Sequence, residues 1–79
     1  MAPTVLREGA FRLFFFSREE SRMHVHISHS DGEAKYWLEP SIALAQNFGL
    51  SASLLRQAEQ LVKTHEHRIR TAWNEHFGS

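Results

Sequence analysis

Residues 23–38 read MHVHISHSDGEAKYWL, a pattern that predicts a β-hairpin. Apolar and polar side chains alternate over residues 23–30 and again over residues 33–38, which is the two-residue period of a β-strand. Between the two runs, Asp31-Gly32 is a two-residue sequence that favours a type I′ turn. We therefore expect two antiparallel strands joined by a tight turn at Asp31-Gly32.

A two-residue turn at this place determines which residues face one another across the hairpin. It would pair His26 with Trp37 and His24 with Glu39. Because side chains alternate across a strand, the hairpin has one apolar face and one polar face. The apolar face would hold Val25, Ile27, Ala34, Tyr36 and Leu38, and the opposite face His24, His26, Ser28, Lys35, Trp37 and Glu39. We expect the first face to be core and the second to be a functional surface.

The remaining N-terminal residues extend this hairpin into a meander. Residues 4–6 and 11–16 are strand-like, and residues 17–22 form a charged loop that leads into the histidine-bearing strand. Pro40 ends the following strand, because proline has no hydrogen to donate to the sheet. Residues 42–48 fit either a short helical turn or an edge strand, and we favour the edge strand.

The C-terminal third predicts one continuous helix. Ser51 is a suitable N-cap, and Leu50 and Leu55 occupy the two positions of a hydrophobic staple. No glycine or proline interrupts residues 52–77, and Gly78 is placed to end the helix. The expected architecture is a single α+β domain over residues 1–79, an antiparallel meander of four to five strands (about 4–48) with one long C-terminal α-helix (about 52–77) packed on one face.

Such a helix is longer than the strands beneath it. At ~1.5 Å per residue it spans roughly 38 Å, whereas a six-residue strand spans only ~20 Å. It should therefore overhang the sheet, kink near Thr64-His65, or pack its far end on another copy. An overhang would expose Ile69, Trp73 and Phe77, and an exposed apolar patch of this kind indicates a partner or an oligomer.

Composition restricts the function further. The chain has 79 residues and no cysteine, so it has neither a disulfide nor a thiolate zinc site. Nine Lys and Arg residues balance nine Asp and Glu residues, whereas a dedicated nucleic-acid binder usually carries a positive excess. The longest strictly apolar run is residues 13–16, so we expect a cytoplasmic protein without a signal peptide or a membrane partner.

The strand over residues 11–16 adds to the polar face of the hairpin. Arg12, Phe14 and Phe16 share one side of this strand. The candidate binding face is therefore Arg12, Phe14, Phe16, His24, His26, Lys35 and Trp37. The alternative interpretation is that a second layer or a partner subunit covers Phe14 and Phe16.

Three kinds of chemistry could use this face. A His-x-His strand directs two imidazoles the same way, so His24 and His26 with Glu39 could hold a metal ion, although we expect no cofactor. Alternatively, His24 and His26 could cleave RNA without metal as base and acid, with Lys35 or Arg12 stabilising the charged transition state. Protein recognition, with aromatic and arginine anchors, needs no special geometry and is favoured, so an enzyme is the less favoured class.

Five motifs, in this order, resemble one small bacterial family. They are PTVL (3–6), FFF (14–16), HVH (24–26), GEAKYWLEP (32–40) and AWNEHFG (72–78), and the family is the domain of unknown function 4160. The resemblance implies a short cytoplasmic protein encoded beside a small protein of another family of unknown function, number 2442, in a pair that resembles a toxin–antitoxin module. The His-x-His element of the family then corresponds to His24 and His26, and its lysine–aromatic strand to Lys35 and Trp37.

The functional expectation combines both lines of argument. The chain is expected to be the toxin-like half of such a pair, binding a cognate small protein or another copy of itself through the candidate binding face or the helix overhang. The alternatives are a metal-independent ribonuclease, for which RNA is the partner, and a His-x-His metal-binding protein.

Overall fold

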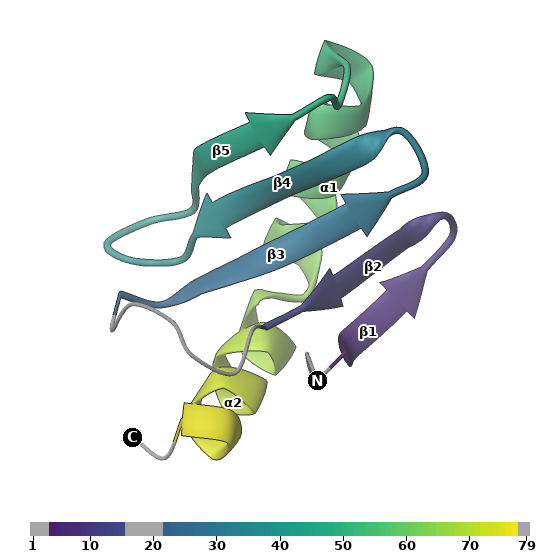
Figure 1. The fold of residues 1–79 in the computed structure, drawn as a ribbon. Helices are drawn as coiled ribbons and strands as arrows, with labels where there is room; N and C mark the ends of the chain where they lie inside the picture. The colour runs from purple at the N-terminus through teal and green to yellow at the C-terminus, as the bar shows by residue number, and fades with distance from the viewer. Residues whose placement is uncertain (1–3, 16–21, 78–79) are drawn as a thin grey trace.

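The computed structural model describes residues 4–15 and 22–77 and consists of a five-stranded sheet followed by two helices (Figure 1). The strands are β1 (Thr4–Glu8), β2 (Phe11–Phe14), β3 (His24–His29), β4 (Gly32–Trp37) and β5 (Ala43–Phe48), and the helices are α1 (Ala52–Thr64) and α2 (Glu66–Phe77). Neighbouring strands are antiparallel, and their order in the sheet follows the sequence. The α+β meander is thus confirmed, with residues 43–48 as an edge strand. Phe16 lies outside the described residues.

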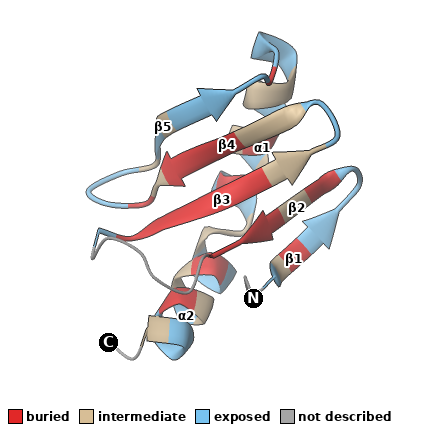
Figure 2. Cartoon of the chain, in the orientation of Figure 1, coloured by how far each residue is buried: buried red, intermediate tan, exposed pale blue. Residues whose placement is uncertain are grey.

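Both helices lie on the same face of the sheet, and the core fills the space between the layers (Figure 1). Alternation along β3 and β4 directs the apolar face of the hairpin into this core, as the sequence pattern predicted. The buried core side chains include Leu13, Phe15, Val25, Ile27, Ala34, Tyr36 and Leu38 from the sheet side, and Ala58, Val62, Ile69 and Trp73 from the helices. Burial is concentrated in β2, β3 and β4, whereas β5 is mostly exposed (Figure 2).

The prediction of one long helix is wrong, because the helix breaks at His65. This residue has φ −106° and ψ 19°, its N–H donates to the Leu61 carbonyl, and its own carbonyl accepts from Ile69. The side chains around the break contact β1, since His65 Nε2 lies 3.2 Å from Glu8 Oε1 and Arg68 donates to the Val5 carbonyl over 3.3 Å. Contacts with the sheet therefore bend the chain near Thr64-His65 although the local sequence contains no helix breaker.

The break removes the expected overhang. Each helix has 13 or 12 residues and therefore spans about 20 Å, close to the length of a strand. Ile69 and Trp73 are buried, and Phe77 is half-buried with its ring centroid 4.1 Å from that of Trp73. The interpretation of Ile69, Trp73 and Phe77 as an exposed interface is corrected: these side chains close the core beneath α2.

The register of the central hairpin also differs from the prediction. His26 faces Lys35 and His24 faces Trp37, so the two turn residues are Ser30 and Asp31. Gly32 is needed for another reason: a β-carbon there would collide with the carbonyl oxygen of Phe48 in β5. Because the register shifts by two residues, every side chain stays on its predicted face.

In the part of the chain that the structure describes, no helix is long and apolar enough to cross a membrane.

Candidate binding surface on the open face of the sheet

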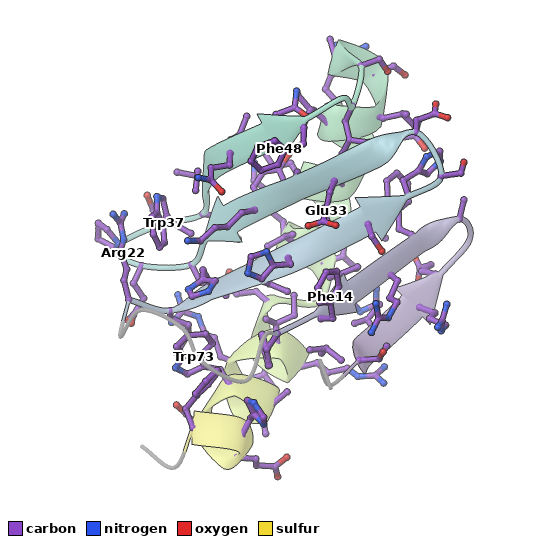
Figure 3. The ribbon with its side chains drawn as sticks, in the orientation of Figure 1. Phe14, Arg22, Glu33, Trp37, Phe48 and Trp73 are labelled. Carbon is purple, nitrogen blue, oxygen red and sulfur yellow. The ribbon has the colours of Figure 1, made fainter. Side chains whose placement is uncertain are left out.

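The face of the sheet that neither helix covers is called the open face here, and the register arranges its side chains in three rows. One row across the strands holds Arg7, Arg12, Ser28, Glu33 and Phe48. The second holds Thr4, Phe14, His26, Lys35 and Gln46, and the third His24, Trp37 and Ala43. Figure 3 shows Phe14, Glu33 and Phe48 on this side of the sheet, with Arg22 beside Trp37. The structure thus brings the described members of the predicted face together.

Aromatic and cationic side chains are in contact along this face. The Arg12 guanidinium lies 4.5 Å from the centroid of the Phe14 ring, and its Nε donates to Thr4 Oγ1 over 2.8 Å. Phe14 stacks on His26 at 5.4 Å, and the His26 and His24 rings meet edge to face at 5.3 Å. These contacts form one connected row from β2 to β3.

Trp37 contacts a second group of cationic side chains on this surface. The guanidinium of Arg22 lies 4.2 Å from the indole ring and Lys35 Nζ lies 4.5 Å from it. Arg22 is held in place because its Nε donates to the carbonyl of Glu39 over 2.8 Å. Trp37 and Arg22 keep exposed surface, so this cation–aromatic group is accessible at the end of β4.

His24 is part of the packed interior. It is 0% exposed, and its ring meets that of Trp73 in α2 at 5.0 Å. Nδ1 lies 2.7 Å from the carbonyl oxygen of Arg22, and because that oxygen can only accept, Nδ1 carries the hydrogen. Phe14, His26 and Lys35 are also buried, so among the described members of the candidate binding face only Arg12 and Trp37 keep exposed surface.

The predicted set of metal ligands does not assemble. His24 faces Trp37 rather than Glu39, whose carboxylate lies 3.6 Å from Arg70 Nη1 instead. Among residues 4–15 and 22–77, no group of three or more His, Cys, Asp or Glu side chains is arranged to hold a metal ion. The shift in register explains this difference, since it moves Glu39 past the end of the paired strands.

Comparison with known proteins identifies the family. The family model of a domain of unknown function, DUF4160, matches residues 10–74, which is most of the chain. This chain belongs to the DUF4160 family. The resemblance inferred from the five motifs is therefore confirmed. No curated protein and no solved structure gives a significant match.

Sequence reasoning missed the exposed apolar residues of this DUF4160 chain. Among the described residues, the large hydrophobic side chains that stand exposed are Leu44 and Phe48, at 44% and 61% of their full surface. Both belong to β5, which pairs with β4 on one side and forms an edge of the sheet. The available signal was composition, because ALAQNF at residues 43–48 contains no charged residue.

Two hollows lie at the other end of the DUF4160 sheet, away from Trp37. One, of about 400 Å³, is bordered by Phe11, His29, Gln57 and Leu61, among others, and lies between the β1–β2 turn and α1. The other, of about 340 Å³, is bordered by Arg7, Arg12 and Ser28, among others. Arg12 is the member of the predicted binding face that borders the second hollow, whereas His24 and His26 are among the residues of neither hollow.

Tyr36 connects the buried face of β4 to α1. Its hydroxyl donates to the carbonyl of Leu55 over 3.0 Å. Burial raises the pKa of this phenol above its ordinary value of 10.0, and the negative charge of Glu59 raises it further. Tyr36 is therefore a structural group whose neutral form the fold favours.

Proposed function

We propose that this chain is a partner-binding protein, the toxin-like half of a toxin–antitoxin-like pair in the cytoplasm, and that it binds its partner along β5 and the adjoining part of the open face. The observation that carries the proposal is the exposure of Leu44 and Phe48 on an uncharged edge strand. Leu44 faces Tyr36 and Phe48 faces Glu33, so the two exposed apolar side chains lie on opposite faces of the same edge strand, where an added strand could contact both.

The backbone of β5 supports the same site. An edge strand presents unpaired N–H and C=O groups along its outer side, and proteins usually protect such an edge with charged residues or proline. Residues 43–48 contain neither, although one irregularity in the β4–β5 register interrupts the strand beside Tyr36. A partner segment in extended conformation could therefore add to the sheet through main-chain hydrogen bonds.

The cation–aromatic group supplies the side-chain anchors. Trp37 faces Ala43 across the β4–β5 ladder, so the indole borders the exposed strand directly. Trp and Arg are the residue types that contribute most to binding energy at interfaces. Because the exposed Arg22 guanidinium lies over this ring, a partner segment that carries carboxylates has the complementary charge.

The ribonuclease alternative has weaker support than protein binding. An acid–base pair must reach the proton that it transfers, and His24 has no exposed surface. Its Nδ1 hydrogen is already directed at the Arg22 carbonyl. These observations favour a structural role for His24.

The test uses the neighbouring small protein of the family of unknown function 2442, with binding measured by calorimetry. Leu44→Ser and Phe48→Ser change exposed side chains, so the fold should persist, and each is expected to weaken binding about tenfold or more. Arg56→Ala and Gln60→Ala, on the exposed side of α1, are the matched controls and should stay within about twofold of the wild-type affinity.

Two results would contradict parts of this proposal separately. Equal affinity of the β5 variants and the α1 controls would show that the partner binds elsewhere. Expression of the chain alone should slow growth, and co-expression of the neighbour should restore it. If expression alone leaves growth unchanged, the toxin-like role is wrong even where binding occurs.

A further inference from the structure

The hollow of about 400 Å³ lies on the helix side of the sheet, between the β1–β2 turn and α1. Small-molecule sites in proteins have volumes of this order, and they combine an apolar wall with a few polar groups. Three elements contribute to the border of this hollow. Its residues include Glu8 and Phe11 from the β1–β2 hairpin, His29 from β3, and Gln57, Gln60 and Leu61 from α1.

One wall of the hollow is built from two rings and an aliphatic side chain. The centroids of the Phe11 and His29 rings are 4.9 Å apart, and the rings are inclined by 46°. His29 lies on the helix side because it follows the core residue Ile27 by two positions along β3. Half-buried Leu61 adds an aliphatic group from α1. Because aromatic pairs contribute more than their buried area, this wall favours a planar aromatic ring over an alkyl chain.

A carboxylate stands beside this wall. Glu8 and Phe11 are cross-strand partners in the β1–β2 ladder, so their side chains lie on the same side of the sheet. Glu8 Oε1 lies 3.2 Å from His65 Nε2, which holds the carboxylate close to the helices. The Glu8 side chain keeps 54% of its surface exposed, and a carboxylate has about four lone-pair sites. It can therefore accept a hydrogen bond from a bound molecule while it contacts His65.

Two amide side chains of α1 add further acceptors. Gln57 and Gln60 are three residues apart, with Leu61 next in sequence, so the three side chains lie on one side of the helix. Gln60 is oriented because its Nε2 donates to Thr64 Oγ1 over 3.2 Å. A protonated amine has three N–H donors and no acceptor, so carboxylate and amide oxygens suit it. The negative charge of Glu8 favours this cation over a neutral or an anionic group.

We propose that this hollow binds a small aromatic amine, with the ring against Phe11, His29 and Leu61 and the protonated amino group at Glu8. The site is separate from the proposed partner interface, because the residues that border it belong to neither β4 nor β5. The inference therefore does not rest on the proposed function, and either can fail without the other.

The test is an NMR titration of the full chain with four probes of graded chemistry: 2-phenylethylamine, 2-phenylethanol, 3-phenylpropanoate and n-butylamine. 2-Phenylethylamine should give saturable shifts at the amides of Phe11, His29 and Leu61. It should bind about threefold to fivefold more tightly than 2-phenylethanol, which is the size of effect expected of an ion pair with a half-exposed carboxylate. 3-Phenylpropanoate should bind more weakly than the alcohol, and n-butylamine, which lacks the ring, should not saturate.

A variant of the carboxylate separates its charge from its shape. Glu8→Gln keeps the size of the side chain and changes an exposed position, so the fold should persist. It should remove the preference for 2-phenylethylamine over 2-phenylethanol and leave the affinity for the alcohol unchanged. Glu75→Gln, at an exposed carboxylate of α2, is the matched control and should keep the full preference.

Three results would overturn this proposal. The first is the absence of saturable shifts with 2-phenylethylamine at the three amides. The second is a Glu8→Gln variant with an unchanged melting temperature that still prefers the amine to the alcohol. The third is saturable binding of n-butylamine at the same amides with the affinity of 2-phenylethylamine, because the aromatic wall would then contribute nothing. Should Glu8→Gln lower the melting temperature, the four probes on the wild-type chain decide the assignment.

Discussion

His24 donates through Nδ1 to the carbonyl oxygen of Arg22 over 2.7 Å. The same imidazole contacts Trp73 of α2 and Trp37 of β4, so it connects the end of the sheet to the second helix. A side chain in this position contributes to packing and to hydrogen bonding at once.

His24→Ala should therefore destabilise the fold by about 2–4 kcal/mol, through a lost hydrogen bond and a cavity against Trp73. The matched control is His67→Ala on the exposed side of α2, which should stay within about 0.5 kcal/mol of wild type. Urea denaturation provides both values. A His24→Ala variant as stable as wild type would contradict the structural role and reopen the catalytic one.

Gly32→Ala should loosen β5, because the new β-carbon would meet the Phe48 carbonyl oxygen. The expected cost is about 1–3 kcal/mol, with faster amide exchange over residues 43–48. Gly9→Ala is the comparison: Gly9 has φ 59°, and a β-carbon added there would meet no atom within 4 Å. It should cost about 1–2 kcal/mol by backbone strain and leave exchange in β5 unchanged. Unchanged exchange in Gly32→Ala would show that β5 does not approach this closely.

The free energy of unfolding should depend on pH through Tyr36. Its folded-state pKa is raised by burial and by Glu59, so the neutral phenol is favoured in the folded state. Its contribution is complete below the unfolded-state pKa of about 10 and is lost as pH rises through the folded-state pKa. Tyr36→Phe should be about 1 kcal/mol less stable than wild type at pH 8, and this difference should shrink above pH ~10.

This pH experiment has a direct spectroscopic counterpart. Tyr36 is the one tyrosine of the chain, so tyrosinate absorbance in the folded protein reports on this residue. A difference between Tyr36→Phe and wild type that stays constant up to alkaline unfolding would mean that burial does not raise the pKa.

Arg70 should contribute more to stability than other helix-surface ion pairs. Its Nη2 donates to the Leu38 carbonyl over 2.7 Å and its Nε to Glu66 over 2.8 Å, so it joins α2 to the sheet. Arg70→Ala should cost about 1–3 kcal/mol, because it leaves a carbonyl without this donor. Lys63→Ala removes an exposed pair with Glu59 and should cost at most about 0.5 kcal/mol. Equal effects would show that the contact with Leu38 contributes little.

The faces of the strands could be predicted from the sequence, whereas the pairing of their residues could not. Alternation is a local property, so Val25 and Ile27 are identified as core from their neighbours alone. The register depends on Gly32, which the Asp31-Gly32 pattern assigns to the turn. In the fold Gly32 accommodates the Phe48 carbonyl of β5, a contact between residues distant in sequence.

Contacts between residues distant in sequence explain both the helix break at His65 and the burial of His24. No residue near His65 is a helix breaker, and the bend follows contacts of His65 and Arg68 with β1. His24 is buried in part by Trp73, which is 49 positions further along the chain (73 − 24). Polar residue types predicted a functional face, but tertiary packing decides which of its members reach solvent.

The most direct test of partner binding along β5 is hydrogen–deuterium exchange of the chain, free and in complex with the small protein proposed as its partner. Addition of a partner strand should slow exchange of the outward-facing amides within residues 43–48 by about tenfold or more, while the exposed side of α1 stays unchanged. Slower exchange confined to α1 or α2, with β5 exchanging as in the free chain, would contradict the proposed interface.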